Sequence, residues 1–328
     1  MQLLMSEAAH ARVARELAAF AGRLDVVTMA ADGALSRDGQ ALGEAPVNPE
    51  LFWISLDMVG SGLLGDAFRR VLRGSRGRWL QTFNAGLDDP VFARVMAKGL
   101  RLTKSDAQAT PIAEYVLAHA FSLLHPIAAQ AEAQRAHDWR RIEFREIGST
   151  RWLIVGLGSI GREIARRLQP FGAHLTVVRR RPAPDPLAAD VRSTAELLSL
   201  LPAADVVILA CPLTPQTQGM ADEAFFAALK PGSILVNIGR GGLVDEDALR
   251  ASLDRDRPGC AVLDVFQTEP LPPDAWFWDH PKVRVTAHDS NAGDGALARG
   301  DAAFLVNLRR YLAGEPLLNE AHPHEVGL

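Results

Sequence analysis

The chain has 328 residues, more than one hydrophobic core usually serves, so we expect two domains. A hydrophobic content of 48% is that of an ordinary globular protein, and the formal net charge of −4 argues against a nucleic-acid partner or attraction to a membrane surface. The two cysteines, Cys211 and Cys260, lie far apart, which fits a reduced compartment and argues against a disulfide framework or a metal site.

The first twenty residues predict a strand followed by an amphipathic helix. Charged side chains recur there at helical spacing, at Glu7, Arg12, Arg15 and Glu16, and no long apolar run is present. This pattern argues against a signal peptide or a membrane span, so we expect a cytoplasmic protein.

Strand and helix patterns alternate from there to about Thr103. Strands are expected at "LDVVTMA", "LFWISL" and "RWLQTF", and helices at "GDAFRRVL" and "PVFARVMAKG". Between the first two strands, "AADGALSRDGQ" holds two Asp-Gly pairs and predicts a turn-rich loop or a hairpin. A long helical pattern then runs from Pro111 to His137, and a helix of that length is expected to connect two domains.

The alternation becomes more regular after this helix. Six near-continuous apolar runs are typical of parallel strands buried on both faces: "RWLIVGLG", "HLTVV", "DVVILAC", "SILVNIG", "CAVLDVF" and "VRVTAH". Helical patterns separate them, so this half predicts a doubly wound α/β sheet. The final helix, "GALARGDAAFLVNLRRYLAG", is expected to return to the first domain, which would otherwise be short.

A glycine pattern stands between the first of these strands and the helix that follows it. Gly156, Gly158 and Gly161 form G-x-G-x-x-G, in which the glycines permit a tight turn, close approach of a pyrophosphate and close packing of helix on strand. The helix amino terminus at Ser159 and Ile160 offers free N–H groups to that pyrophosphate. These five residues predict a dinucleotide site.

Three arginines follow the next strand, where NAD-binding chains usually carry an acidic residue for the adenosine ribose. A guanidinium at Arg179 can instead pair with phosphate oxygens. We expect Arg179 with Arg180 to hold the 2′-phosphate of NADP(H), so that NADP(H) is preferred and NAD(H) is possible. The alternative is that the arginines only keep the loop soluble, and we assign that role to Arg181.

Three later motifs complete a pattern that resembles the D-isomer-specific 2-hydroxyacid dehydrogenase family, of the glyoxylate/hydroxypyruvate reductase type. They are "VNIGRGGLVDEDAL" with Arg240, "LDVFQTEPLP" with Glu269, and "VRVTAH" with His288, accompanied by "CPLTPQT" and "LKPGSILVN". The resemblance is strong from Gly148 to Ser290. It is looser earlier, where "LQTFNAGLDDPVF" is similar to the family's substrate loop and "AEYVLAHAF" to its connecting helix.

The resemblance implies a fold of two α/β domains with the active site in the cleft between them. A Rossmann NAD(P)-binding domain, residues 113–290, would be inserted into a smaller flavodoxin-like substrate domain made of residues 1–112 and a terminal helix within 291–328. Members commonly form homodimers through the cofactor domain, so we expect a homodimer.

The same resemblance implies reduction of a small 2-oxo acid to the D-2-hydroxy acid. His288 would give the carbonyl oxygen its proton, since imidazole titrates near neutral pH. Glu269 would orient the imidazole, and Arg240 would bind the substrate carboxylate and carbonyl oxygen. Backbone N–H groups of Asn84, Ala85 and Gly86 would hold the carboxylate from the opposite side.

Four further residues receive cofactor roles from the resemblance. Cys211 and Pro212 would belong to the loop that covers the adenine and ribose, and Ile238 and Asp264 stand at strand ends expected to face the nicotinamide. Cys211 is otherwise a small buried hydrophobe without reactive thiol chemistry.

Two departures from the family pattern surround the histidine. Many members have Thr-Pro-His where this chain has Thr286-Ala287-His288, so its backbone is expected to be less rigidly set. Asp289 then replaces an apolar residue. Its carboxylate would raise the pKa of His288 if it points inward and have no effect if it faces water.

Three other functions stay open. A sensor or corepressor could bind the cofactor on this fold without turnover, although Arg240, Glu269 and His288 argue against it. An adenosyl-methionine methyltransferase is disfavoured by Arg179 and by the later His/Glu pair. Within the dehydrogenases, oxidation of phosphoglycerate, formate or phosphite is a further alternative.

Overall fold

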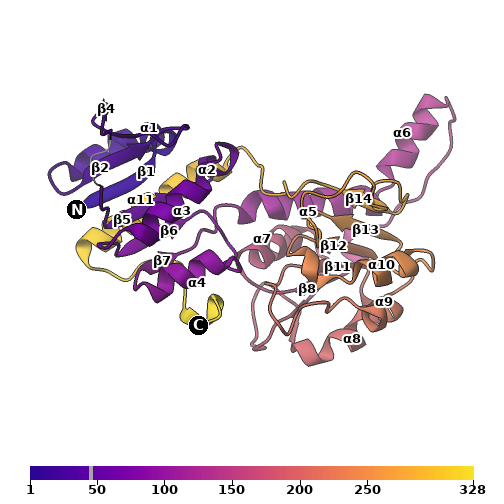
Figure 1. Cartoon of the computed structure of the whole chain (residues 1–328). Helices are drawn as coiled ribbons and strands as arrows, with labels where there is room; N and C mark the ends of the chain where they lie inside the picture. Colours follow the sequence, from indigo (N-terminus) through magenta and orange to yellow (C-terminus); the bar gives the residue numbers. More distant parts are fainter. Residues whose placement is uncertain (44–46) are drawn as a thin grey trace. The chain divides into compact units, whose positions relative to one another are not determined.

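The computed structural model describes residues 1–43 and 47–328 in two compact units, and each unit is considered by itself (Figure 1). Unit 1 comprises Met1–Gln108 and Asp294–Leu328, and unit 2 comprises Ala109–Gly293. The sequence had placed the two boundaries after residues 112 and 290.

Unit 1 contains a seven-stranded sheet in the order β4-β3-β2-β1-β5-β6-β7. The strands are β1 (Gln2–Ser6), β2 (Asp25–Met29), β3 (Leu35–Arg37), β4 (Gln40–Ala41), β5 (Leu51–Ile54), β6 (Trp79–Thr82) and β7 (Arg101–Thr103). Strands β2, β1, β5, β6 and β7 are parallel and follow the flavodoxin-like order. The predicted hairpin is the antiparallel pair β3–β4, and Asp38 and Gly39 both have positive φ, as a type I′ turn requires.

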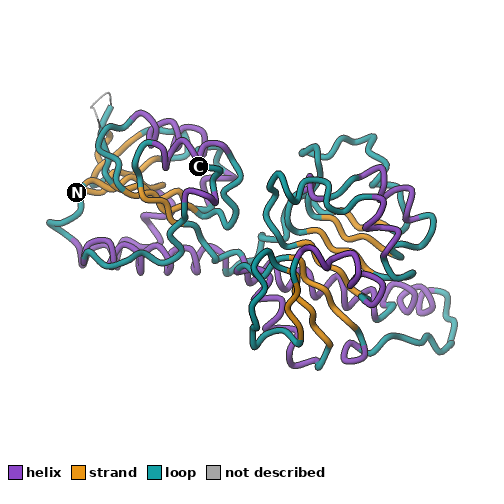
Figure 2. Tube along the Cα trace, turned by 90° about the horizontal axis from the view of Figure 1, so that it is seen from below, coloured by secondary structure: helices purple, strands orange, loops and turns teal. Residues whose placement is uncertain are grey.

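Helices cover both faces of this sheet (Figure 2). One face packs against α1 (Glu7–Leu17) and α11 (Ala296–Ala313), where Trp53 of β5 stacks on Phe304 with ring centroids 4.0 Å apart. The other face packs against α2 (Asp57–Gly60), α3 (Leu64–Arg73) and α4 (Pro90–Ala97). The carboxyl-terminal α11 therefore shares a core with β1, β5 and β6.

Unit 2 contains a second seven-stranded sheet, parallel throughout, in the order β10-β9-β8-β11-β12-β13-β14. Its strands are β8 (Arg151–Val155), β9 (His174–Val178), β10 (Asp190–Arg192), β11 (Val206–Leu209), β12 (Ile234–Asn237), β13 (Cys260–Leu263) and β14 (Val283–Val285). The strand order reverses between β8 and β11, as in Rossmann domains, and ligands of such sheets bind beyond the carboxyl ends of the strands.

Alternate residues of these strands enter two cores. In β8, Trp152 and Ile154 face α5 (Ala109–Leu124) and α7 (Ser159–Leu168), whereas Leu153 and Val155 face the opposite layer. That layer holds α8 (Leu197–Leu200), α9 (Glu223–Ala228) and α10 (Glu246–Leu253). Burial on both faces explains why these strands are apolar without alternation.

Short 3₁₀ turns join several of these elements. They are η1 (Ala18–Phe20), η2 (Ile147–Ser149), η3 (Gln169–Phe171), η4 (Thr194–Glu196), η5 (Leu201–Ala203), η6 (Gly241–Leu243) and η7 (Pro323–Glu325).

The predicted single helix over residues 111–137 is wrong. The structure has two helices, α5 and α6 (Ile127–Arg135), which meet at a bend of 56°. The helix breaks at Pro126 because proline lacks the N–H that would continue the helical hydrogen bonds and its ring clashes with the preceding turn. Within the described residues no single helix is long and apolar enough to cross a membrane. Only this bent pair of helices, taken together, has the length and composition of a candidate span.

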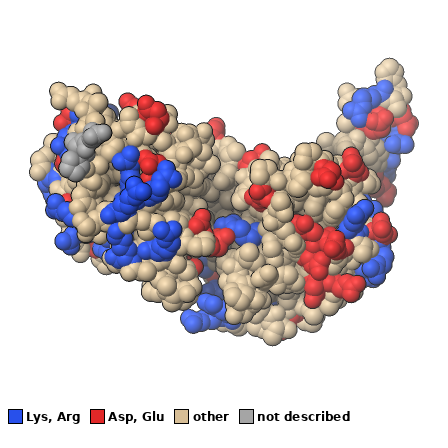
Figure 3. Space-filling model, viewed as in Figure 1, with Lys and Arg blue, Asp and Glu red and all other residues tan. Residues whose placement is uncertain are grey.

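The surface charge is unevenly distributed over each unit (Figure 3). In unit 1, exposed basic side chains gather on and beside α3 and α4: Arg69, Arg73, Arg76, Arg94 and Lys98. In unit 2, exposed acidic side chains gather at the starts of α9 and α10: Asp222, Glu223, Asp245 and Asp247. The formal net charge of −4 does not reveal these two surfaces.

Candidate active site

The glycine loop connects β8 to α7, and the sites of Gly156 and Gly161 are closed to any side chain. Gly156 has φ +105°, and a Cβ there would lie 2.8 Å from the carbonyl oxygen of Ala210. A Cβ on Gly161 would lie 2.2 Å from the carbonyl oxygen of Gly156. These two glycines are therefore required by the protein's own backbone packing.

Gly158 differs from these two because a Cβ at this position would meet no protein atom within 4 Å. Its φ is −77°, which any residue adopts, so neither strain nor packing explains the glycine. It caps α7, and no side chain caps that helix, which leaves N–H groups of the first turn available. An open cradle at a helix amino terminus suits the pyrophosphate of a dinucleotide.

Arg179 and Arg180 directly follow β9, as the sequence indicated. Arg179 is half-buried and Arg180 is exposed, and neither guanidinium forms a hydrogen bond or an ion pair with a residue that the structure describes. The nearby carboxylate of Asp185 instead pairs with Arg162, at 2.6 Å. Arg179 is still close enough to Asp185 for its charge to help lower the pKa of that carboxyl. Neither Arg179 nor Arg180 is held in a direct ion pair with a described residue, so both are available to bind a phosphate group.

Arg240 follows β12 in a turn that Asn237 holds. The Asn237 side chain, which is fully buried, donates to the carbonyl oxygen of Arg240 at 3.0 Å and accepts from the N–H of Gly239 at 3.1 Å. The Arg240 guanidinium donates to the carbonyl oxygen of Gly239 at 2.8 Å. Gly241 allows this turn to touch the segment after β13, since a Cβ there would lie 1.9 Å from the carbonyl carbon of Phe266.

Glu269 and His288 form a direct pair. One carboxylate oxygen of Glu269 accepts the N–H of Phe266 at 2.9 Å, and the other lies 2.7 Å from Nδ1 of His288. A carboxylate can only accept, so Nδ1 of His288 carries the proton it donates and Nε2 is the ring nitrogen left for exchange with a ligand. The side chains of His288 and Glu269 are 45% and 35% exposed, so both can be reached from solvent.

A pocket of about 730 Å³ brings these residues together within unit 2. Arg240, Glu269 and His288 all line it, and the loop after β11 contributes Leu213 and Gln218. A cation, a carboxylate and an imidazole at the carboxyl ends of neighbouring parallel strands can bind an anion and transfer a proton. The sequence singled out these three residues, and they converge on one concave surface.

The other expected cofactor residues have different surroundings. The pKa of Cys211 is raised to about 11 by burial, so the thiol stays protonated, and Pro212 follows it in the loop after β11. Ile238 is 6% exposed and belongs to the core that contains α5 and α7. The carboxylate of Asp264, 1% exposed, accepts hydrogen bonds from the segment that carries His288.

The expected substrate residues Asn84, Ala85 and Gly86 follow β6 in unit 1. The N–H of Asn84 donates to Thr82 Oγ1 at 3.3 Å, so it already has a partner within the protein. Among the described residues, none accepts a hydrogen bond from the N–H of Ala85 or Gly86. Two of the three predicted N–H groups are therefore free to hold an anion.

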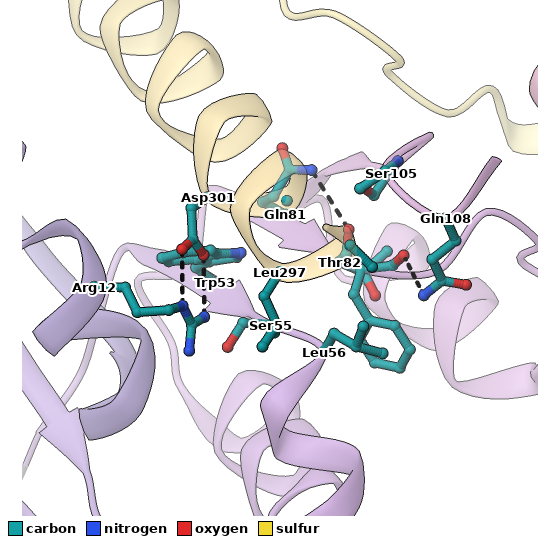
Figure 4. A pocket seen from close by; sticks show the side chains of 14 residues that line it. Arg12, Trp53, Ser55, Leu56, Gln81, Thr82, Ser105, Gln108, Leu297 and Asp301 are labelled. Carbon is teal, nitrogen blue, oxygen red and sulfur yellow. Dashed lines mark hydrogen bonds and ion pairs between the residues drawn. The ribbon is translucent and has the colours of Figure 1, made fainter. Parts of the chain in front are cut away.

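The same edge of unit 1 encloses a cavity of about 20 Å³, enough for a single water molecule (Figure 4). Polar side chains surround it: Arg12, Ser55, Gln81, Thr82, Ser105, Gln108 and Asp301. Arg12 reaches Asp301 at 2.8 and 3.0 Å and Asp57 at 2.9 Å, which joins α1, α2 and α11. Sequence patterns gave no sign of this network, because its members are far apart in the chain.

The chain is similar to known proteins over much of its length. The family model "D-isomer specific 2-hydroxyacid dehydrogenase, NAD binding domain" matches residues 117–290. A D-3-phosphoglycerate dehydrogenase from Mycobacterium leprae is 36% identical over 239 residues, which are 70% of this chain but only 44% of that protein's length. A glyoxylate/hydroxypyruvate reductase A from Arabidopsis thaliana is 31% identical over 73% of this chain and 76% of its own.

A solved structure extends the similarity to nearly the whole chain. It is a D-isomer specific 2-hydroxyacid dehydrogenase from Xanthobacter autotrophicus Py2 in complex with NADPH and MES. It has 26% sequence identity and a TM-score of 0.78, and the match covers 98% of each chain.

Proposed function

Because the chain belongs to the D-isomer-specific 2-hydroxyacid dehydrogenase family, we propose that it reduces a small 2-oxo acid, of the glyoxylate or hydroxypyruvate kind, to the D-2-hydroxy acid with NADP(H) as the preferred cofactor. The observation that carries this proposal is the 2.7 Å contact between His288 Nδ1 and Glu269 in the pocket that Arg240 also lines. The glyoxylate/hydroxypyruvate reductase from Arabidopsis thaliana supports the substrate class.

The residues of the pocket have distinct tasks in this reaction. When bound, the reduced nicotinamide supplies the hydride for the carbonyl carbon. His288 gives the proton on Nε2 to the carbonyl oxygen, and Glu269 stabilises the imidazolium that precedes this transfer. Arg240 binds the substrate carboxylate and stabilises negative charge that develops on the oxygen. We also propose that the N–H groups of Ala85 and Gly86, which have no acceptor among the described residues, bind a carboxylate.

The preference for NADP(H) is proposed from the arginines after β9. Arg179 and Arg180 form no ion pair with a described residue, so both guanidinium groups can pair with a 2′-phosphate without first breaking a bond within the protein. Gly156, Gly158, Ser159, Ile160 and Gly161 would hold the pyrophosphate. The relative from Xanthobacter autotrophicus Py2, which was solved with NADPH, supports this choice.

An assay with two cofactors and paired variants tests the proposal. Glyoxylate and hydroxypyruvate are reduced with NADPH and with NADH, and we expect NADPH to give the higher kcat/KM. Replacing Arg179 and Arg180 together with alanine should lower kcat/KM for NADPH about 100-fold through loss of two charged contacts and leave the value for NADH nearly unchanged. The control is Arg181→Ala, which should alter neither value. Equal use of both cofactors by the unmodified protein would contradict the assigned preference.

Oxidation of 3-phosphoglycerate is a second candidate, because the relative from Mycobacterium leprae is 36% identical over the matched residues. Including 3-phosphoglycerate with NAD and NADP in the same panel separates the two substrate classes. Tight cofactor binding without turnover of any acid in the panel would instead favour a sensor. The expected homodimer and cytoplasmic location also remain proposals, and sedimentation would test the first.

A further inference from the structure

His288 has a backbone conformation that its residue type rarely adopts. Its φ is +52°, in the left-handed region, and the residue before it is Ala287. Alanine does not restrict the backbone as a proline would, so the conformation needs other support. Strained residues of this kind persist only where their surroundings hold them.

A single buried carboxylate holds the chain on both sides of His288. Asp264, at the end of β13, accepts the hydroxyl of Thr286 at 2.7 Å. It also accepts the N–H of Asp289 at 3.0 Å and that of Ser290 at 3.2 Å. Because these donors stand before and after His288, Asp264 fixes the direction in which the imidazole leaves the backbone.

Thr286 links this carboxylate to helix α5. Its Oγ1 lies 2.7 Å from the hydroxyl of Tyr115, and its only hydroxyl hydrogen is directed to Asp264. Tyr115 must therefore be the donor and Thr286 the acceptor. Burial raises the pKa of Tyr115 to about 12, so the phenol keeps this proton at any physiological pH.

Helix α5, which carries the donor Tyr115, is packed into the core of unit 2. Residues on either side of Tyr115 are buried, among them Ala113, Val116 and Leu117, and α5 packs against α7 and β12 in the core of unit 2. A hydrogen-bonded chain thus runs from a packed helix through Tyr115, Thr286 and Asp264 to the segment that carries His288.

We propose that Tyr115 and Thr286 are positioning residues for the acid–base step, acting through Asp264 to hold the His288 imidazole against Glu269. The proposal rests on the reductase function proposed above. Neither residue lines the pocket that contains Arg240, whereas His288 does, so we expect their effect to reach the reaction through the orientation of His288.

Loss of this orientation should lower kcat more than it raises KM. Thr286→Val keeps the side-chain shape but removes both hydrogen bonds, and we expect kcat to fall about 30-fold. Tyr115→Phe removes only the outer bond and should lower kcat about fivefold. The KM values for the oxo acid and NADPH should stay within about twofold in both variants. The double variant should be no slower than Thr286→Val, because both changes break the same chain.

Two further variants separate positioning from general damage. Thr286→Ser retains the hydroxyl and should recover most of the lost kcat. Tyr311→Phe is the matched control, since Tyr311 is the other tyrosine of the chain and its hydroxyl has no hydrogen bond with a described residue. It should leave kcat unchanged.

A measurement that does not depend on turnover completes the test. In two-bond ¹H–¹⁵N spectra of protein labelled with ¹⁵N-histidine, His288 is assigned by its absence in His288→Gln. We expect the neutral ring to be protonated at Nδ1 in the unmodified protein and to shift toward the other tautomer in Thr286→Val. If the unmodified protein reduces no oxo acid but this shift occurs, the proposed function fails and the positioning role stands. An unchanged tautomer together with a kcat within twofold in Thr286→Val overturns the positioning role.

Discussion

At the carboxyl edge of the unit 1 sheet, four polar residues are at most 4% exposed: Ser6, Ser55, Thr82 and Ser105. At the corresponding edge in unit 2, the side chains of Glu269 and His288 are 35% and 45% exposed. The first edge encloses a cavity of about 20 Å³, and the second opens into a pocket of about 730 Å³.

The comparison of the two edges shows that charged residues in similar positions have different roles, which depend on their partners. In unit 1, Arg12 is neutralised by Asp57 and Asp301, so its bonds hold two distant parts of the chain together. In unit 2, Glu269 leaves Nε2 of His288 without a described protein partner, so the pair can act on a ligand. Changes at the first edge should alter stability, and changes at the second should alter turnover.

The largest expected effect is that of His288→Gln in unit 2. It should lower kcat by about 1000-fold, because a glutamine amide cannot transfer the proton, and shift the Tm by less than about 2 °C. Steady-state assays and thermal unfolding measure the two effects. His174→Gln, at an exposed histidine, is the control and should change neither. A variant with normal turnover would place the acid elsewhere.

Glycine replacements distinguish packing from ligand binding within the same loop. Gly161→Ala puts a Cβ 2.2 Å from the carbonyl oxygen of Gly156 and should destabilise unit 2 by about 3 kcal/mol. Gly158→Ala meets no protein atom, so it should leave stability unchanged and lower NADPH affinity about tenfold. Hydrogen exchange of residues 109–293 and calorimetric titration measure these outcomes. Normal NADPH affinity in Gly158→Ala would remove the pyrophosphate from this loop.

Arg12→Met tests the stabilising edge in unit 1. It leaves Asp57 and Asp301 without their cation and should destabilise the unit by about 2 kcal/mol, seen as faster hydrogen exchange in residues 1–108. Burial alone would raise the pKa of Asp57, but hydrogen bonds from Ser6, Arg12 and Ser55 outweigh it and the pKa is lowered.

The sign of that shift gives the pH dependence of the Arg12 effect. A lowered carboxyl pKa contributes stability above its unfolded value and loses it as the pH falls through the folded pKa, so the difference between Arg12→Met and the unmodified protein should shrink below about pH 4. The control is Arg69→Met, which removes an exposed pair with Asp66 and should cost less than about 0.5 kcal/mol. Equal costs for the two variants would contradict the role of the Arg12 network.

The smallest expected effect concerns His119 in α5. Burial, followed by the nearby charge of Arg284, lowers its pKa, and its Nδ1 is buried without a partner among the described residues. The unfolded chain therefore takes up a proton near pH 6.5 that the folded chain resists, so stability should fall between about pH 7 and 5. His119→Leu should flatten this part of the plot of Tm against pH, whereas His174→Leu should not. Parallel curves for the two variants would exclude His119 as the cause.

Much of unit 2 could be predicted because most of its strands are separate apolar runs, each followed by a candidate site residue. Arg240, Glu269 and His288 each follow such a run, and parallel strands bring their carboxyl ends to one edge. The break at Pro126 was missed because the helical spacing of apolar residues continues across it. The strands β7 (RLT) and β10 (DVR) were missed because each contains a single apolar residue and so gives no apolar run.

The sequence by itself determined the α/β fold class and its glycine loop, and it singled out three residues for acid–base chemistry, since these depend on local patterns and on motif order. Only the tertiary structure decided which groups hold them. Asn237 clamps the Arg240 turn, and Asp264, Thr286 and Tyr115 support His288 across 171 residues of chain. Such contacts join side chains whose separation in sequence follows no period, so folding alone brings them within hydrogen-bonding distance.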